Sequence, residues 1–341
     1  MGAAVRAGAC LAIGIAAASC AAGPADCSGR ELAVCIEEAG FEGTAYLEQG
    51  SEVLLWQRFG DSVAVRAGSE ARYRIGSLTK SFTAALVLRL EEQGKLGLSD
   101  PLSRWIPGFA QGDSIRLHHL LHHQAGIRPF TKDDFDSLRA RSLTLEEVVE
   151  ILRGRALRFR PGTDVEYSDP GYLVLGRVVE LATGRAWEEV LRSELTGPLG
   201  LTSVAFAEWD ADVPDLAPGR NAAGSPVTPV DYSFVRSSGG LVASASDVAR
   251  WTRLLLGGDV LGETATHQLM TADRNEFGYG WVVTQRLGRP VLFHNGQVSG
   301  FFAFTGHFPD DAVTVVLLSN RERPTGALAA GLARAMMGAK P

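Results

Sequence analysis

Just after residue 76, apolar side chains begin to recur at intervals of three and four residues. This spacing predicts an amphipathic helix that starts at Ser77 and ends near Gly94, a residue type typical of helix C-caps. Ser77 then lies at the helix N-terminus, and Lys80 lies one turn further along the same face. The apolar positions of this helix are Leu78, Phe82, Ala85, Leu86 and Leu90.

Runs that are typical of strands occur near both ends of the chain. Strands at both ends with helices between them predict an α/β chain with one sheet built from both termini and a helical lobe inserted between them. We expect a single domain over 21–341, with a sheet lobe at about 28–76 and 277–341 and a helical lobe at about 77–276. The predicted strands cover residues 44–49, 52–59, 73–75, 279–286, 290–294, 301–308 and 312–319.

Helical periodicity returns in several other segments. Thr144 and Ser246 stand at predicted N-caps, Pro170 stands in a first turn, and Gly184 stands near a C-cap. The predicted helices cover residues 28–40, 144–152, 170–182, 187–195, 246–256 and 326–337.

The composition narrows the class of protein. With 45% hydrophobic and 21% charged residues, the 341-residue chain has an ordinary globular composition. Its net charge of -6 argues against a nucleic-acid-binding surface. We expect a monomer whose partner is a small-molecule or peptide substrate.

The first twenty residues have the features of an export signal. Arg6 precedes an Ala-rich apolar run over 9–18, which ends in small residues and Cys20. This end also resembles a bacterial lipobox, in which the cysteine becomes lipid-anchored, although Ala17 replaces the usual leucine. We therefore expect residues 1–20 to be a signal and the protein to be periplasmic or in the cell envelope, with membrane attachment only through Cys20.

All four cysteines lie in the first 35 residues, which leaves none for a catalytic or metal site later in the chain. After removal of a signal, Cys27 and Cys35 remain. They either pair in an oxidising compartment or stay as two free thiols, and the sequence leaves both alternatives open.

Ser77 and Lys80 form an S-x-x-K pair, in which an amine can take the proton of a hydroxyl and so activate it as a nucleophile. Lys80 is one of only four lysines in a chain that prefers arginine, and lysine can lose its proton when desolvated whereas arginine cannot. The alternative is a capping serine beside a solvated lysine.

Three stretches together are more specific: Ser77-Leu78-Thr79-Lys80, Tyr167-Ser168-Asp169 and His294-Asn295-Gly296. With these motifs the chain, from about 41 to 320, closely resembles the serine β-lactamase-like family. That family includes class C β-lactamases, D-alanyl-D-alanine carboxypeptidases, D-aminopeptidases and family VIII carboxylesterases. The resemblance implies the β-lactamase/transpeptidase-like fold, in which the sheet is mainly antiparallel and flanked by terminal helices, with the site in a cleft between the two lobes.

The resemblance also implies roles for individual residues. Ser77 would form an acyl-enzyme, with Lys80 and Tyr167 together as the base that deprotonates it and later activates water. A cation at Lys80 would lower the pKa of the Tyr167 phenol. The backbone N–H groups of Ser77 and Gln297 would form the oxyanion hole. No metal or cofactor is implied.

The substrate side of the site departs from the family pattern. Asp169 stands where the family usually has asparagine, so a donor to the substrate carbonyl is replaced by an acceptor. Asp169 is instead expected to pair with Lys80 or to favour a substrate amine. His294 replaces a lysine, which removes a permanent cation, and is expected to orient Tyr167 or meet a substrate carboxylate. With Asn295 and with Gly296, whose missing side chain leaves room along the strand, these residues are the expected substrate-binding set.

Both departures favour an esterase, amidase or D-aminopeptidase-like activity over an efficient β-lactamase. Asp169 also keeps open an alternative of another class, a catalytically weak peptide- or β-lactam-binding or sensing module of the cell envelope. A cluster of histidines (His118, His119, His122 and His123) has spacing that fits Zn²⁺. The family carries a similar stretch as scaffold, and we expect no metal there.

Overall fold

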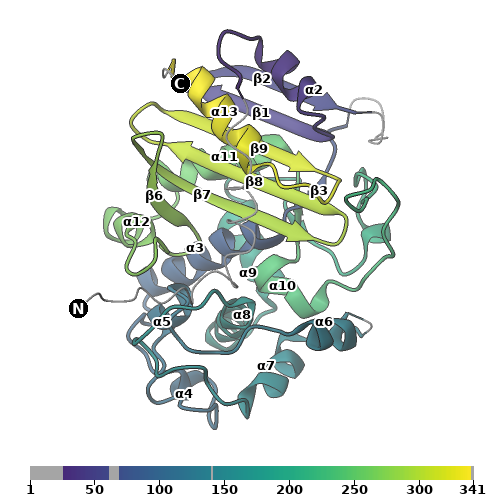
Figure 1. Cartoon of the computed structure of the whole chain (residues 1–341). Helices are drawn as coiled ribbons and strands as arrows, with labels where there is room; N and C mark the ends of the chain where they lie inside the picture. Colours follow the sequence, from purple (N-terminus) through teal and green to yellow (C-terminus); the bar gives the residue numbers. More distant parts are fainter. Residues whose placement is uncertain (1–25, 61–68, 140, 339–341) are drawn as a thin grey trace, which may run out of the picture.

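The main sheet is built from both ends of the chain, as the sequence predicts (Figure 1). A computed structural model describes residues 26–60, 69–139 and 141–338. Its six-stranded sheet has the order β2-β1-β9-β8-β7-β6, and every neighbouring pair is antiparallel. The strands are β1 (Gly43–Gln49), β2 (Glu52–Phe59), β6 (Val282–Arg286), β7 (Arg289–Val298), β8 (Phe301–Phe308) and β9 (Val313–Ser319).

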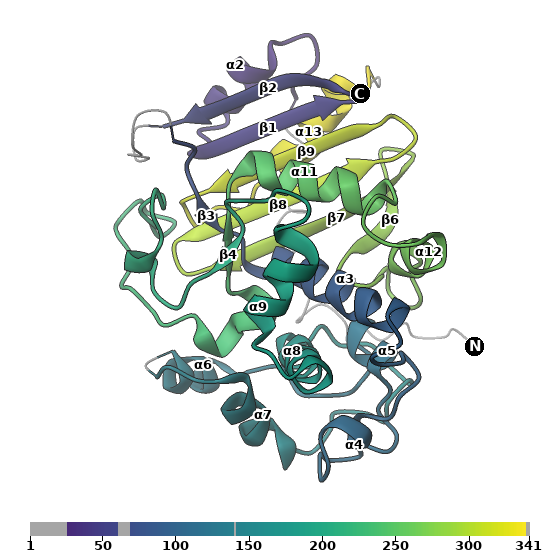
Figure 2. The same cartoon turned by 180° about the vertical axis from the view of Figure 1, so that it is seen from behind.

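Helices cover both faces of this sheet. The terminal helices α2 (Leu32–Glu38) and α13 (Gly326–Met336) pack on one face and enclose a small apolar core (Figure 1). Helix α11 (Ala245–Leu256) crosses the other face (Figure 2), where the sheet joins the main core. A disulfide between Cys27 and Cys35 ties the chain before α2 to the helix itself, which decides between the two alternatives left open above.

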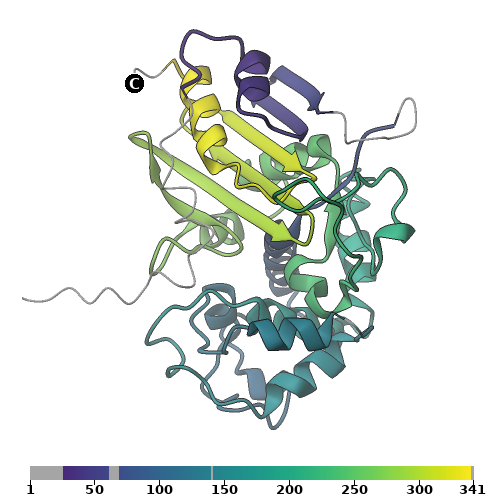
Figure 3. The same cartoon turned by 45° about the vertical axis from the view of Figure 1, so that its right-hand side comes forward.

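The remaining helices form a lobe beside the sheet (Figure 3). Helix α8 (Asp169–Thr183) is its centre and packs against six other helices. Pro170 lies in its first turn and Gly184 at its C-cap, as predicted, and Gly184 has the left-handed conformation. Ser168, which was not predicted as a cap, caps its N-terminus. The other helices are α3 (Thr79–Glu92), α4 (Leu102–Trp105), α5 (Leu117–Leu121), α6 (Lys132–Leu138), α7 (Leu145–Arg153), α9 (Trp187–Leu191), α10 (Arg236–Gly239) and α12 (Glu263–Met270).

Some local predictions differ from the structure. Ser244 rather than Ser246 caps α11, because the Ser244 hydroxyl accepts from Asp247 N–H while the Ser246 hydroxyl donates to Glu70. The predicted helix over 187–195 ends at Leu191 and continues as a π-helical turn.

Two strand predictions also change. Strand β3 (Tyr73–Arg74) does not join the main sheet but pairs with β5 (Leu241–Ala243), which also pairs with β4 (Ala205–Phe206). Strand β7 runs on to Val298, so the motif His294-Asn295-Gly296 lies inside the strand rather than at its end. The edge of β7 beyond Phe293 is not paired with β6, and this stretch faces the turn that carries Ser77.

Candidate active site

Ser77 lies in a tight 3-10 turn, η1 (Gly76–Leu78), that leads directly into α3. Gly76 enters this turn with a φ of +51°, a conformation that favours glycine. Lys80 follows in the first turn of α3, and its Nζ lies 3.1 Å from Ser77 Oγ. The S-x-x-K spacing therefore brings the amine and the hydroxyl into hydrogen-bond contact.

The Lys80 ammonium group is fully buried and uses all three of its donors. Besides Ser77 Oγ, it contacts Asp169 Oδ1 at 2.5 Å and the Ser238 carbonyl oxygen at 2.8 Å. Burial lowers the pKa of Lys80, but the Asp169 carboxylate and the Tyr167 phenol raise it, and the net pKa lies above its ordinary value. Lys80 is therefore a charged donor in the free site, not a neutral amine.

Tyr167 lies beside this ion pair in a buried position. Lys80 Nζ is 4.8 Å from the centre of its ring, and the His123 ring is 4.6 Å away on centroids. Its hydroxyl is buried and makes no hydrogen bond of normal geometry within the described parts of the chain. Burial raises the pKa of Tyr167, and the opposing effect of Lys80 does not offset it. The Lys80 charge does act to lower the phenol pKa, as expected, but burial outweighs it and the Asp169 carboxylate adds to the effect of burial, so the net pKa in the free site is raised.

Strand β7 packs so closely on the Ser77 turn that neither element has room for a side chain at the contact. A Cβ on Gly296 would lie 1.9 Å from the Ile75 carbonyl oxygen, and one on Gly76 would lie 2.7 Å from the Gln297 nitrogen. The space on the Cβ side of Gly296 is thus filled by the protein's own backbone, which differs from the expectation that the missing side chain leaves room for substrate along the strand. The same contact brings Ser77 and Gln297, the predicted oxyanion-hole pair, close together, and both residues line a pocket.

His294 is buried and its ring centre lies 6.3 Å from that of Tyr167. Its Nδ1–H donates to the Asn295 carbonyl oxygen at 2.6 Å, which leaves Nε2 as the acceptor. Burial, helped by the nearby Lys80 charge, lowers the pKa of His294 to about 4. At neutral pH this side chain therefore carries no charge with which to meet a substrate carboxylate.

A pocket of about 170 Å³ opens beside Ser77. Its walls are mainly apolar and aromatic, and Asp169 and Gln297 line it together with Ser77. His294, Asn295 and Gly296 are not among the residues that line it. The lining residues are Ser77, Phe135, Arg139, Asp169, Val230, Tyr232, Phe234, Val235, Ser238, Gly239, Gln297, Val298 and Ser299.

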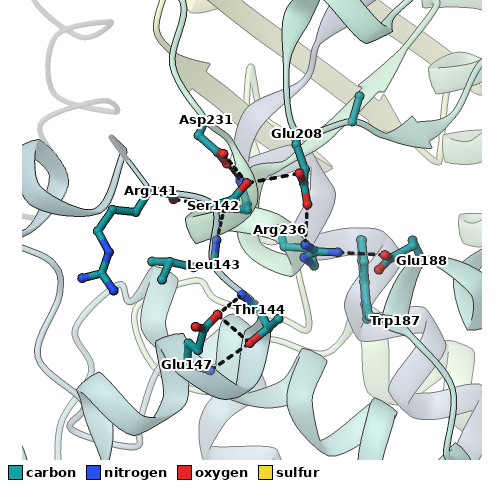
Figure 4. Close-up of polar contacts among 12 residues, drawn as sticks. Arg141, Ser142, Leu143, Thr144, Glu147, Trp187, Glu188, Glu208, Asp231 and Arg236 are labelled. Atoms are coloured by element: carbon teal, nitrogen blue, oxygen red, sulfur yellow. Dashed lines mark hydrogen bonds and ion pairs between the residues drawn. The ribbon is translucent and has the colours of Figure 1, made fainter.

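A network of ion pairs and hydrogen bonds holds α10, the helix that carries Ser238 (Figure 4). Arg236 pairs with Glu188 at 2.7 Å and with Glu208 at 3.1 Å. Ser142 Oγ in turn contacts Glu208 and the buried Asp231. Because α10 is anchored on several sides, the Ser238 carbonyl is fixed where it accepts from Lys80.

The histidine cluster takes part in the scaffold. Each of its four rings has a separate backbone partner: His118 with Leu98, His119 with Arg116, His122 with Phe277 and His123 with Ser168. Within the described ranges no group of three or more histidine, cysteine or acidic side chains is arranged to hold a metal ion.

Sequence reasoning missed several groups at the site. Ser238 supplies a backbone carbonyl, which leaves no mark on its side chain. Tyr232 and Arg139 line the pocket from loops whose positions depend on tertiary packing. His123 was noted only as part of the cluster, yet its Nδ1 accepts from Ser168 N–H and so steadies the segment between Tyr167 and Asp169.

The export signal and Cys20 lie outside the described residues. In the part of the chain that is described, no helix has the length and apolar character needed to cross a membrane.

Comparison with known proteins identifies the family. The Beta-lactamase family model matches residues 40–336, so the chain belongs to that family, within the serine hydrolase superfamily. The putative penicillin-binding protein PbpX of Bacillus subtilis (strain 168) is 26% identical over 296 residues, covering 85% of this chain and 73% of that protein. Penicillin-binding protein 4* of the same strain is 25% identical over 319 residues, covering 85% of this chain and 70% of that protein.

Solved structures show the same fold. A penicillin binding protein from Bacillus halodurans superposes with a TM-score of 0.77 at 23% identity, covering 90% of this chain and 99% of that chain. A D-stereospecific amidohydrolase from Streptomyces sp. superposes with a TM-score of 0.76 at 22% identity, covering 89% and 95%. The fold is therefore β-lactamase/transpeptidase-like, as the sequence predicts.

Proposed function

We propose that this protein hydrolyses an ester or amide bond of a small molecule or peptide through an acyl-Ser77 intermediate, without a metal or cofactor. The observation that carries the proposal is the 3.1 Å contact between Lys80 Nζ and Ser77 Oγ, with Ser77 in the lining of a pocket. A serine hydroxyl becomes a nucleophile when an adjacent base takes its proton, and the pocket gives a substrate carbonyl access to it.

In the proposed reaction, Lys80 first loses a proton to solvent and then accepts the Ser77 proton, with Tyr167 beside it. The Ser77 oxygen attacks the substrate carbonyl carbon, and the carbonyl electrons move to its oxygen, facing the N–H groups of Ser77 and Gln297. Breakage of the ester or amide bond passes the proton to the leaving alcohol or amine. Water then attacks the acyl carbon while the same base takes its proton. The base passes this proton to the Ser77 oxygen as the acyl–oxygen bond breaks, which releases the acid and restores the Ser77 hydroxyl.

We further propose that the protein is exported to the periplasm or cell envelope as a monomer and is held at the membrane only if Cys20 is lipidated. The disulfide between Cys27 and Cys35 supports an oxidising compartment. The relatives named as penicillin-binding proteins support a place in the envelope.

One observation favours the second candidate, a catalytically weak binding or sensing module. Lys80 is locked in an ion pair with Asp169 at 2.5 Å, and a charged lysine cannot accept the Ser77 proton. If this pair never opens, the site would bind a peptide or β-lactam and react with it slowly or not at all.

Turnover of a short-chain p-nitrophenyl ester and of a chromogenic cephalosporin distinguishes the two candidates. We expect the wild type to turn over at least one of them. Ser77→Ala should abolish this turnover, and Lys80→Met should lower it by about 10²–10⁴-fold, because the base is lost. Lys95→Met, which removes an exposed lysine, serves as the control. No turnover, together with no labelling of Ser77 by a fluorophosphonate or a fluorescent penicillin, would favour the binding module.

A further inference from the structure

Asp169 and Arg139 are the charged residues in the pocket lining. Arg139 is half exposed, stands at the far end of α6 and already pairs with Asp136 at 2.9 Å. Asp169 lies beside Ser77 and is the one carboxylate among the described residues that line the pocket. Near Ser77, the charge that a substrate meets in the pocket is therefore that of Asp169.

The Asp169 carboxylate is only partly used by the protein. Oδ1 accepts a hydrogen bond from Lys80, and within the described chain Oδ2 accepts none from a protein donor. The side chain keeps 29% of its surface exposed while its partner Lys80 is fully buried. A carboxylate offers several acceptor sites, so a second donor entering from the pocket has an acceptor available.

The groups around this ion pair are neutral near pH 7. His123 and His294 face Lys80 from the loop after α5 and from β7, and burial lowers the pKa of both. Tyr167 and Tyr172 face it from the segment before α8 and from α8 itself, and burial raises the pKa of both. Lys80 and Asp169 therefore balance each other, and an added charge in the pocket is not compensated by any of these neighbours.

We propose that Asp169 selects substrates that carry a protonated amine beside the scissile ester or amide bond, and that this amine frees Lys80 to act as the base. The inference rests on the proposed function. An ammonium group donates to the free side of Asp169, whereas a carbonyl or carboxylate at the same place meets a like partial charge. A second cation next to Asp169 lowers the pKa of Lys80, because like charges disfavour the protonated amine. Lys80 then loses its proton to solvent, and its lone pair can accept the Ser77 proton.

A matched pair of esters tests this selectivity: alanine benzyl ester in both enantiomers, and isobutyric acid benzyl ester, in which a methyl group replaces the ammonium. Release of benzyl alcohol is measured for the wild type, Asp169→Asn and Asp169→Glu, with uncatalysed hydrolysis subtracted. Asp133→Asn, which removes an exposed carboxylate outside the pocket, is the charge-matched control. The ratio of kcat/KM for the two esters cancels effects that a variant has on both.

We expect the ratio of cationic to neutral ester to fall at least 10-fold in Asp169→Asn, to be largely kept in Asp169→Glu, and to be unchanged in Asp133→Asn. The acid limb of the pH profile for the neutral ester should move to lower pH in Asp169→Asn, because Lys80 loses the carboxylate that holds its proton. An equal ratio in wild type and Asp169→Asn would overturn the proposal. If the ratio is equal but the neutral ester is still hydrolysed in a Ser77-dependent way, the selectivity proposal fails and the proposed function stands. If Ser77-dependent hydrolysis is absent as well, the result counts against the proposed function itself.

Discussion

Lys80 stays charged in a fully buried position because three acceptors surround its ammonium group. The Ser77 hydroxyl and the Ser238 carbonyl satisfy two donors, and Asp169 supplies the compensating charge. Burial without such partners would favour the neutral amine. The residue that departs from the family pattern, Asp169, therefore also determines the protonation state of the predicted base.

Tyr167→Phe separates a catalytic from a structural use of the phenol. The Tyr167 hydroxyl is buried and makes no hydrogen bond of normal geometry within the described structure, although Lys80 and Ser77 lie close enough to act on its pKa. A buried polar group without a good hydrogen bond costs about 1–3 kcal/mol. Its removal should therefore leave the free energy of unfolding unchanged or raise it by about 1 kcal/mol. Turnover should nevertheless fall by about 10²-fold or more if the phenol helps to move the proton. Urea unfolding and p-nitrophenyl ester hydrolysis measure the two effects.

The control for this substitution is Tyr279→Phe, a buried tyrosine whose ring packs against His122, whereas the Tyr167 ring packs against Lys80. It should leave turnover close to that of the wild type. A Tyr167→Phe protein with normal turnover would remove Tyr167 from the mechanism and leave Lys80 as the sole base.

At the scale of elements, the site depends on two segments far apart in the sequence that lie in backbone contact. The turn at Ser77 and strand β7 meet through Gly76 and Gly296, and no side chain separates them. Helix α8 brings Asp169 to the same place, with Ser168 as its N-cap. Each of the three elements is determined by residues close together in the sequence, but the pocket forms only where the three elements meet.

Gly296→Ala tests this contact. The added Cβ would lie 1.9 Å from the Ile75 carbonyl oxygen, which belongs to rigid backbone, so β7 and the Ser77 turn must move apart. We expect turnover to fall about 10²-fold or more, because a displacement of about 1 Å at reacting groups has that effect. Overpacking of this kind also costs about 1–3 kcal/mol of stability.

Gly154→Ala is the matched control, because a Cβ there has nothing within 4 Å. Turnover and thermal unfolding of both variants are compared with those of the wild type. Normal activity in Gly296→Ala would show that close packing of β7 on the turn is not needed for the site.

The local elements were predictable, and the way they combine was less so. Helix α8 was predicted with Pro170 and Gly184 in their observed roles, because capping and turn chemistry act within a few residues. The pairing of β3 with β5 was missed, since both strands are too short to give a periodic signal. Ser238 and Tyr232 were missed because a backbone carbonyl and an aromatic wall have no sequence motif.

The directions of the pKa shifts at the site could not be predicted from the sequence either. The family resemblance implies that Lys80 lies near Tyr167, and a neighbouring cation lowers the pKa of a phenol. The net direction depends on burial and on the 2.5 Å contact with Asp169, and both are tertiary facts.

At the scale of the whole molecule, two cores hold the fold. The smaller one joins α2, α13 and one face of the sheet, and the disulfide of Cys27 lies within it. The larger one joins the helical lobe to the other face of the sheet and contains α3 and α8. The site lies at the boundary of sheet and helical lobe, so its buried ionisable groups make the stability of the whole chain depend on pH.

His294 should make the protein less stable as the pH falls below neutrality. Burial lowers the pKa of His294 to about 4 in the folded chain, whereas an unfolded histidine titrates near about 6.5. The unfolded state therefore binds the proton first, and stability that is fully present above about pH 6.5 is lost as the pH falls toward 4. Between pH 7 and pH 5 this one group should lower the free energy of unfolding by about 2 kcal/mol.

His294→Gln removes this titration, so its free energy of unfolding should fall less steeply between pH 7 and pH 5 than that of the wild type. His267→Gln, at an exposed position on α12, should keep the wild-type slope. Urea unfolding at several pH values measures all three proteins. His119, whose pKa burial also lowers to about 4, contributes equally to wild type and variants and cancels in the difference. Equal slopes for the wild type and His294→Gln would mean that His294 accepts a proton in the folded protein, and that it can then present a charge to the substrate after all.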